Sequence, residues 1–468
     1  MGNAKKRSGS VASMLPVLLA CSFTASFGQS MMNVALPELA ERFGVTLSIA
    51  NWVIVGYMVV AATAIMLSAF MLRRLGLRRV FFVGAGALAL GSACALLSQD
   101  FPMLFASRLV QAVGTGLFFP SVTSVIMTNS PAAVRGTRLA LNSGVIAVGL
   151  AISPTASGFA LTQFGWRAMF VVSLAMSVAL LAVGFFRIHG GPSTKRVPID
   201  ALSVMLGPLG LAAFLYGLGE VTRDLAPSLA ALAVGAVLLA LFAWRQFALE
   251  SPLLDLHPLV HPRFAVGILL VMVGMLTSFS MSILLPLYYE GALGYTAFFA
   301  GLLLGPVLVN AAFTFLGGRV FDRHGAWPLI PAGLVLVLVG QATAFFSAES
   351  MIAILIVLSS AAVYAGAGFV VAPSKTAALG TLPPATYSAG ASINSTAVQI
   401  ASAIGSSLFV GVLSADVLRD TAAGAAKASA YAAAFEHTLS IAVVIAAAGL
   451  LVAFFYARAM RKPAGKQR

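Results

Sequence analysis

The sequence predicts an all-α, polytopic membrane protein, and two observations carry this prediction. The 468 residues are 60% hydrophobic and only 9% charged, with a mean hydropathy of +0.99, whereas soluble domains are about a quarter charged. Apolar segments of mostly about 20 residues recur along the whole chain, a length that lets a helix cross a hydrocarbon core about 30 Å thick. The short alternating strands of a membrane β-barrel do not occur in the sequence, so the spans are predicted to be helices.

The apolar pattern predicts about fourteen transmembrane spans. In chain order they cover residues 12–36, 49–71, 80–98, 103–126, 139–163, 167–187, 201–219, 228–246, 264–288, 297–316, 328–347, 352–374, 388–414 and 438–457. Charge gives an independent check, because cytoplasmic loops carry an excess of Lys and Arg. Basic residues precede the first span ("NAKKR") and follow the last ("RAMRKPAGKQR"). Both ends are therefore predicted to be cytoplasmic, which requires an even number of spans.

The two halves of the chain echo each other, as in transporters built from repeated helix bundles. Residues 69–79 read "AFMLRRLGLRR" after the second span, and residues 318–327 read "GRVFDRHGAW" after the tenth. The predicted organisation is a cytoplasmic N-terminus (1–11), an N-terminal six-helix bundle (12–190), two linking transmembrane helices with their inner loops (191–262), a C-terminal six-helix bundle (263–457) and a cytoplasmic tail (458–468).

Five stretches resemble, in order, the motifs of one transporter family. They are "NVALPELAERFGV" at the end of the first span, "NWVIVGYMV" in the second, "RLVQAVGTG" in the fourth, "GVIAVGLAISPTASG" in the fifth and "LPLYYEGALGYTAFFAGLLLGP" across the ninth and tenth. Together they resemble the fourteen-span drug:proton antiporter branch of the major facilitator superfamily over essentially the whole chain. The resemblance implies two six-helix bundles plus two extra linking helices. It also implies a secondary active exporter of drug-like or amphiphilic small molecules in the inner membrane, working by alternating access with proton coupling.

Arg108 is the sharpest candidate for a binding residue. It lies a few residues inside the fourth span, and an ionised side chain near the bilayer centre costs at least about 2.5 kcal/mol. Gln111 follows one turn later on the same helix face, so both are predicted to line a central cavity, where Arg108 binds substrate anions or polarises a proton relay. The alternative is that Arg108 extends to the outer surface. Other polar cavity groups, each equally explained as a helix–helix contact, are predicted at Gln29, Asn33, Tyr57 and Asn142. Trp52 is predicted as an aromatic cavity residue that can hold a cationic substrate by a cation–π contact.

The fifth span carries the antiporter motif of this branch. The motif residues present are Gly149, Pro154 and Gly158, with serine at positions 153 and 157 where glycine is usual. Their spacing of roughly one turn predicts a thin helix face that can kink and lets a neighbouring helix approach closely. The resemblance implies a role in antiport, and ordinary helix packing is the alternative.

The carboxylate that usually carries the proton in this branch is missing from the first helix. Gly28 stands at the aligned position, and no acid of the N-terminal half is predicted to lie within the membrane. Coupling is therefore predicted to rest on Glu290, which follows two tyrosines, or on Glu220, with an interfacial location as the alternative for each. The missing acid also favours neutral or anionic amphiphiles as substrates.

The two basic turns are the predicted gating loops. Their residues are Arg73, Gly76 and Arg78 in the first half and Gly318, Asp322 and Gly325 in the second. In the family, the first loop carries an aspartate thought to steady the outward-open state, and here Arg73 stands in its place. Gate stabilisation is therefore expected to rest mainly on Asp322.

Other classes of function fit the sequence less well. The chain has no nucleophile motif and no phosphate-binding glycine loop, and its five histidines lack metal-ligand spacing, so no enzyme activity, metal site or cofactor is expected. The net charge of +14 is spread between the spans, so no nucleic-acid partner is predicted. The expected partners are a small-molecule substrate, protons and the lipid bilayer, and the protein is expected to be a monomer. Two alternatives remain: an exporter of an endogenous metabolite or siderophore, and a non-transporting membrane receptor on the same fold.

Overall fold

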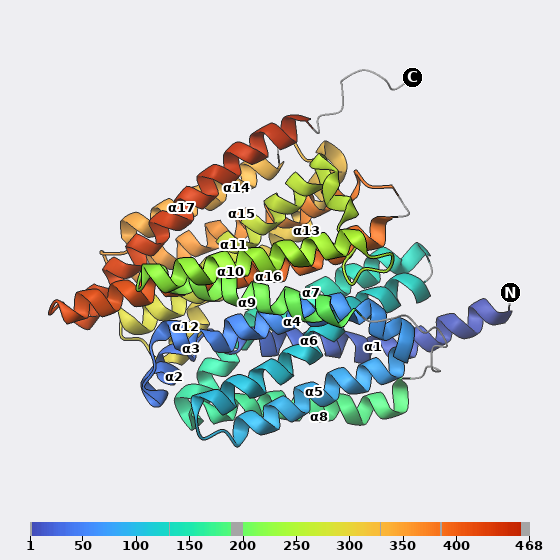
Figure 1. The fold of residues 1–468 in the computed structure, drawn as a ribbon, viewed down its shortest axis with the longest axis horizontal. Helices are drawn as coiled ribbons and strands as arrows, with labels where there is room; N and C mark the ends of the chain where they lie inside the picture. The colour runs from blue at the N-terminus through green and yellow to red at the C-terminus, as the bar shows by residue number, and fades with distance from the viewer. Residues whose placement is uncertain (1, 131, 189–199, 328, 384–385, 460–468) are drawn as a thin grey trace. The chain divides into compact units, whose positions relative to one another are not determined.

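The computed structural model describes residues 2–130, 132–188, 200–327, 329–383 and 386–459, and these residues form helices and turns without any strand. The helices follow one another as antiparallel spans joined mostly by short turns (Figure 1). Their bounds are α1 Gly2–Ser30, α2 Leu36–Phe43, α3 Leu47–Ala50, α4 Trp52–Leu75, α5 Leu77–Leu96, α6 Phe101–Asn129, α7 Ala132–Phe164, α8 Arg167–Arg187, α9 Ala201–Glu220, α10 Leu225–Ala248, η1 His257–Val260, α11 Pro262–Gly291, α12 Ala297–Leu303, α13 Val307–His324, α14 Leu329–Ser347, α15 Ala353–Leu379, α16 Tyr387–Ala422 and α17 Lys427–Ala459.

The predicted number of spans is confirmed. Within the part of the chain that the structure describes, thirteen segments are long and apolar enough to cross a membrane, and Met14–Ser30 of α1 adds a shorter apolar helix. The first span ends earlier than predicted, because α1 stops at Ser30 and residues 31–35 form a turn before the short helix α2.

The tenth span is not one continuous helix. It consists of α12 and α13, separated by residues 304–306, where Val307 N–H donates to the carbonyl of Leu304 at 2.9 Å and Leu308 N–H to that of Gly305 at 3.0 Å. These bonds join residues three positions apart, whereas those of an α-helix join residues four positions apart, so the chain makes a tight turn. Pro306 accounts for the break because it has no N–H to continue the ladder of an α-helix.

The predicted bounds of the last two spans, 388–414 and 438–457, leave residues 415–437 between them as a loop, and this is wrong. Instead, α16 continues to Ala422 and α17 already begins at Lys427. Charged side chains lower the hydropathy of this region, but they pair along the helix: Arg419 Nη2 lies 3.2 Å from Oδ1 of Asp416, three residues earlier. Such pairs stabilise a helix, so polarity here does not end it.

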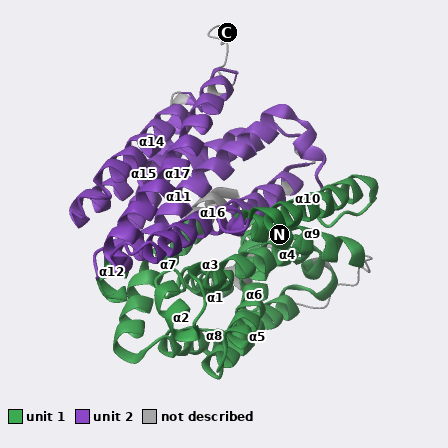
Figure 2. Cartoon of the chain, turned by 60° about the vertical axis from the view of Figure 1, so that its left-hand side comes forward, with its two compact units in different colours: residues 1–218, 225–254, 295–302 green, residues 219–224, 255–294, 303–468 purple. Residues whose placement is uncertain are grey.

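The chain divides into two compact units (Figure 2). Unit 1 contains Met1–Leu218, Leu225–Leu254 and Tyr295–Leu302; unit 2 contains Gly219–Asp224, Asp255–Gly294 and Leu303–Arg468. In unit 1 a cluster of buried side chains joins α1, α5 and α6, among them Leu18, Phe81 and Phe118. In unit 2 a second cluster joins α11, α14, α15 and α17, including Leu270 and Ile330. In a bilayer such contacts stabilise by close packing, because lipid tails are as apolar as the side chains.

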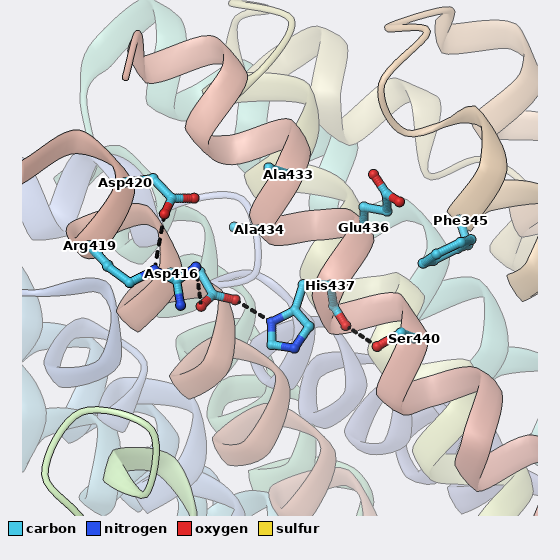
Figure 3. Close-up of a pocket in the computed structure, with 9 residues that line it drawn as sticks. All are labelled: Phe345, Asp416, Arg419, Asp420, Ala433, Ala434, Glu436, His437 and Ser440. Carbon is cyan, nitrogen blue, oxygen red and sulfur yellow. Dashed lines mark hydrogen bonds and ion pairs between the residues drawn. The ribbon is translucent and has the colours of Figure 1, made fainter. Parts of the chain in front are cut away.

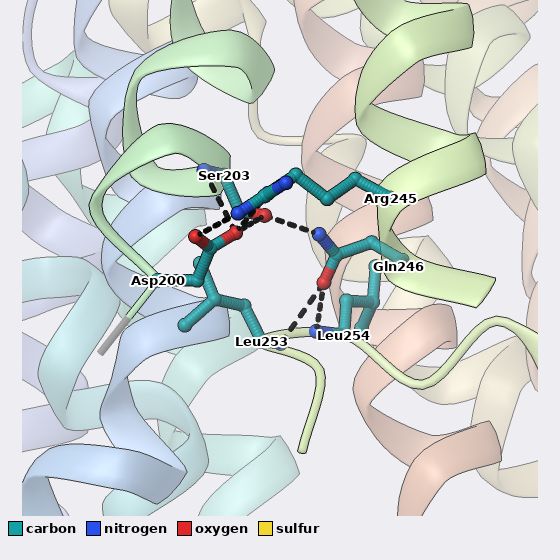
Figure 4. A network of polar contacts seen from close by, with 6 residues as sticks. All are labelled: Asp200, Ser203, Arg245, Gln246, Leu253 and Leu254. Atoms are coloured by element: carbon teal, nitrogen blue, oxygen red, sulfur yellow. Dashed lines mark hydrogen bonds and ion pairs between the residues drawn. The ribbon is translucent and has the colours of Figure 1, made fainter. Parts of the chain in front are cut away.

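A polar clamp fixes the hairpin of α9 and α10 (Figure 4). Arg245 donates two hydrogen bonds to the carboxylate of Asp200, from Nε at 2.6 Å and from Nη2 at 2.8 Å. Ser203 donates its hydroxyl to Asp200 and accepts a 2.7 Å bond from Gln246 Nε2. Gln246 Oε1 in turn accepts the backbone N–H groups of residues 253–254. Through these bonds, chiefly that of Arg245, the pKa of the Asp200 carboxyl lies well below its usual range.

Candidate functional site

Arg108 lies in α6 and its side chain is fully buried inside unit 1, with 0% of its surface exposed. Its guanidinium reaches the backbone of two neighbouring helices: Nη1 donates to the carbonyl of Gly28 in α1 at 3.0 Å, and Nε donates to that of Val53 in α4 at 3.3 Å. The side chain is thus directed into the helix packing and does not reach outward to a surface. It links three helices at one point.

A hydrogen-bonded chain of side chains continues from Arg108 across the unit. Nη1 also donates to Oε1 of Gln111 at 2.7 Å, and Nε2 of Gln111 donates to the hydroxyl of Ser92 in α5 at 2.7 Å. That hydroxyl lies 3.0 Å from the hydroxyl of Ser173 in α8. The predicted pairing of Arg108 and Gln111 on one helix face is present, and Ser92 and Ser173 extend it in a way the sequence did not suggest.

Tyr57 completes the surroundings of the guanidinium. Its ring centroid lies 4.1 Å from Cζ of Arg108, a distance at which the π face attracts a cation. Its hydroxyl is hydrogen-bonded to that of Thr115 at 2.5 Å. The structure therefore gathers three of the predicted site residues, Tyr57, Arg108 and Gln111, into one buried cluster, hereafter the Arg108 site.

The charge of Arg108 has no acidic counterpart. Among the residues that the structure describes, no carboxylate forms an ion pair with it, and its Nη2 has no hydrogen-bond partner. A charged side chain inside a membrane protein costs about 2.5–3.5 kcal/mol on insertion scales when it is not compensated. A cation held only by carbonyls, an amide and a ring is therefore expensive, which points to a function.

The other predicted cavity residues lie at separate contacts. Asn142 of α7 accepts a 2.7 Å hydrogen bond from the hydroxyl of Ser22 in α1, so it serves as a helix–helix contact. Trp52, partly buried, lies edge-on to Phe105 and close to Tyr216, with ring centroids 6.5 and 6.3 Å apart. Gln29 is partly buried at the end of α1, and Asn33 is buried in the turn that follows.

The antiporter-motif residues of α7 lie where this helix meets α1 and α12. A Cβ added at Gly149 would overlap Ser26 of α1, and one added at Gly158 would overlap the backbone of Ala297 in α12. Pro154 lies on the same contact, since a Cβ at Gly301 would overlap its carbonyl.

Two hydrogen bonds accompany this close approach. Thr155 donates its hydroxyl to the carbonyl of Gly301 at 2.9 Å, and Ser153 donates to that of Phe27 in α1 at 2.7 Å. The predicted thin helix face is present, and the serine that replaces a motif glycine is used as a donor.

The two predicted gating loops share one backbone feature. Gly76, between α4 and α5, has φ +78°, and Gly325, after α13, has φ +74°, a left-handed conformation that glycine adopts without strain. Arg78 lies over Phe82, 6.0 Å from its ring centroid. The side chains of Arg73 and Asp322 lie outside the described residues, and Gly318 is within α13 with open space beside it.

The two predicted coupling acids both lie at helix ends. Glu220 is the last residue of α9, and its side chain, 11% exposed, lies 3.6 Å from Nη1 of Arg223. Glu290 is the penultimate residue of α11, is partly buried and interacts electrostatically with Tyr431 of α17. Both acids belong to unit 2, whereas the Arg108 site belongs to unit 1.

A second polar cluster, in unit 2, was not predicted from the sequence (Figure 3). Asp416 of α16, with 6% of its side chain exposed, lies between Arg419 at 3.2 Å and the imidazole Nδ1 of His437 at 2.6 Å. Together with Asp420 and Glu436 these residues line a cavity of about 450 Å³. The sequence contains the acid and the histidine, but the predicted spans placed both Asp416 and His437 in the segment between two helices. Their contact across two helices was therefore not expected.

Comparison with known proteins identifies the family. The sequence matches the Major Facilitator Superfamily over residues 18–406. It is 31% identical over 458 residues to the lincomycin resistance protein LmrB of Bacillus subtilis (strain 168), covering 95% of each chain. It is 25% identical over 403 residues to a multidrug resistance protein B homolog of Mycobacterium tuberculosis (strain CDC 1551 / Oshkosh), covering 84% of this chain and 74% of that protein.

A solved structure supports the same fold. The POT family transporter PepTSo matches with a TM-score of 0.66 at 14% identity, covering 95% of this chain and 98% of that one, a likeness that concerns the fold alone. The chain therefore belongs to the major facilitator superfamily, in its fourteen-span drug-efflux branch, and is a multi-pass membrane transporter of small molecules and not an enzyme.

Proposed function

We propose that the protein is a secondary active exporter of drug-like or amphiphilic small molecules, driven by protons and working by alternating access between its two predicted six-helix bundles. Support comes from the relatives, whose names refer to lincomycin and multidrug resistance and which match most of the chain. Lincomycin is accordingly the first compound to test.

The observation that carries the proposal is the buried and uncompensated charge of Arg108. A structural role alone would be served as well by an apolar residue, which avoids the cost of burying a cation. In the proposed function, Arg108, Gln111 and Tyr57 bind the substrate, and further contacts come from Gln29, Asn33, Trp52 and Asn142.

The proposed driving force is the proton gradient. A proton that crosses about 100 mV releases about 2.3 kcal/mol, enough to sustain a roughly 50-fold substrate gradient. Glu290 is the first choice for the group that takes up and releases this proton, and Glu220 is the second. The face of α7 formed by Gly149, Pro154 and Gly158 is proposed to move against its neighbours as the protein alternates.

The test is uptake of labelled lincomycin into everted membrane vesicles that contain the protein. We expect energised vesicles to accumulate the compound, an uncoupler to abolish accumulation, and Arg108→Ala to reduce uptake at least tenfold at unchanged protein level. Wild-type uptake by Arg108→Ala would exclude the binding role, and uptake insensitive to the uncoupler would exclude proton coupling. If a panel of drugs is not transported and a metabolite or siderophore is, the exporter has an endogenous substrate; if nothing is transported, the receptor alternative is favoured.

A further inference from the structure

The donors of Arg108 are not all used. A guanidinium has five N–H groups; the bonds to Val53, Gly28 and Gln111 use Nε and Nη1. Both N–H groups of Nη2 remain, and no described residue accepts them although the atom is buried. Buried donors in folded proteins are almost always paired, so this atom is a place where a ligand gains binding energy.

The partners that do contact the guanidinium are all neutral. They are two backbone carbonyls, the amide of Gln111 and the ring of Tyr57. Two other charged side chains with little exposure are held in ion pairs: Asp200 binds Arg245, and Asp416 binds Arg419 and His437. The Arg108 site lacks only this element, a negative charge.

The backbone of α1 leaves space for a side-chain atom at Gly28, whose carbonyl accepts a hydrogen bond from Arg108. A Cβ added there would lie 3.7 Å from the Tyr57 hydroxyl, which is ordinary contact, and would meet no other atom within 4 Å. The neighbouring contact of α1 differs, because a Cβ at Gly149 of α7 would overlap Ser26. A side chain can therefore be added to α1 at Gly28, whose carbonyl already binds Arg108. About half a turn away, at Ser26, the same helix is tightly packed against α7.

From the unused donors, the missing charge and the space beside Gly28, we propose that the Arg108 site binds the carboxylate or similar anionic group of an amphiphilic substrate. This inference rests on the proposed function and names its substrate class. Nη2 donates to the anion, with Nη1 held by Gly28 and Gln111, and the ring of Tyr57 supports the guanidinium from its face. A hydrogen bond from a charged guanidinium to an anionic oxygen is shorter and roughly twice as strong as one between neutral groups.

The test introduces a negative charge near Arg108 by mutation. Gly28→Asp places a carboxylate beside Arg108, and Gly28→Asn adds nearly the same volume without charge. The probes are dansylated alkyl chains that differ only in their end group, which is a carboxylate, a carboxamide or an ammonium. We expect the wild type to transport the carboxylate probe at least tenfold faster than the ammonium probe, Gly28→Asp to reverse that order, and Gly28→Asn to keep it whatever its absolute rate.

Two results would overturn the inference while leaving the exporter intact: export of lincomycin without any preference for the carboxylate probe, or an unchanged preference in Gly28→Asp. A third concerns the source of the anion. If the carboxylate probe has no advantage and transport of all three probes requires chloride, an inorganic anion occupies the site and the substrate assignment is wrong.

A binding measurement separates this inference from the proposed function. Purified wild-type protein should bind the carboxylate probe, seen as an increase in dansyl fluorescence, and Arg108→Gln should lose at least tenfold in affinity. Binding of this kind without transport in vesicles would support the anion site and contradict the exporter; absence of binding by a folded wild-type protein would contradict the anion site.

Discussion

Arg108 and Asp200 represent two ways of holding a charge in an apolar chain. Asp200 is partly exposed and receives two bonds from Arg245 and two from Ser203, one from its N–H and one from its hydroxyl, so its charge is neutralised within the structure. Arg108 is buried more deeply and has only neutral partners. At the scale of single residues, the first arrangement suits stability and the second suits a binding site that is completed by a ligand.

Asp200→Asn tests the stabilising arrangement. The pKa of Asp200 in the folded protein is lowered, so its ion pair stabilises the fold above the unfolded pKa of about 3.9 and loses this effect as the pH falls through the folded pKa. We expect the variant to have a melting temperature a few degrees lower at pH 7, and the difference to shrink below about pH 4. Thermal unfolding of the detergent-purified protein measures this, and a difference that does not change with pH would contradict the assignment.

Asp416 offers a second test, with a matched control four residues away. Asp416 is 6% exposed and pairs with both His437 and Arg419, whereas Asp420 is 28% exposed and pairs with Arg419 alone. Asp416→Asn should lower the free energy of unfolding by about 1–3 kcal/mol, and Asp420→Asn by less than about 1 kcal/mol. Chemical unfolding of the two purified variants gives the comparison; equal losses would mean that the buried pair has no special weight.

At the residue scale, the sequence anticipates contacts whose partners lie within one helix. Arg108 and Gln111 are one turn apart, so their pairing follows from helix geometry alone. Asp416 and His437 are 21 positions apart, and their contact depends on where two helices end. Hydropathy does not determine such ends to within one turn, so this cluster required the structure.

At the scale of helices, α7 and α12 depend on the absence of side chains at their contact. Gly158 faces the backbone of Ala297, while Gly144, also in α7, is exposed, and a Cβ added to it would meet nothing within 4 Å. The sequence identified the small-residue face of α7 but not its partner, because the break between α12 and α13 depends on how Pro306 is accommodated. Hydropathy over residues 297–316 is continuous and contains no sign of that break.

Replacing each of these glycines by leucine provides a matched pair. Gly158→Leu must push α12 away from α7, so we expect a loss of stability of about 1–3 kcal/mol, typical of overpacking, and at least a tenfold loss of transport. Gly144→Leu adds the same side chain to the same helix in open space and should behave as the wild type. Melting temperature and lincomycin uptake are the two readouts, and equal behaviour of both variants would show that the close approach is not required.

At the scale of the whole molecule, the two basic turns are the features on which the predicted internal repeat rests. Both end a helix with a glycine of positive φ, Gly76 and Gly325, and the surrounding sequences share basic residues but differ at Arg73 and Asp322. The repeat and the fourteen spans follow from the sequence because they depend on length and periodicity. The grouping of segments into two units does not, since it depends on contacts between helices far apart in the chain.

The difference between the two turns leads to a prediction about gating. Asp322→Asn should reduce transport more than any single substitution at Arg73, because in the predicted gating role only the second turn carries an acid. Initial rates of uptake in vesicles, at matched protein level, would show this. Equal tolerance at both positions would mean that neither turn stabilises the gate through charge.

The break in the tenth span has a consequence for biosynthesis. Residues 295–302 belong to unit 1, although they follow about forty residues assigned to unit 2. They pack against one face of α7, which leaves the ribosome long before them. At about 5–20 residues per second, that face waits on the order of ten seconds for its partner. During this interval the part of α7 around Pro154 and Gly158 lacks the helix that packs against it in the folded protein, so the nascent chain must keep this close-packing surface available until α12 is made.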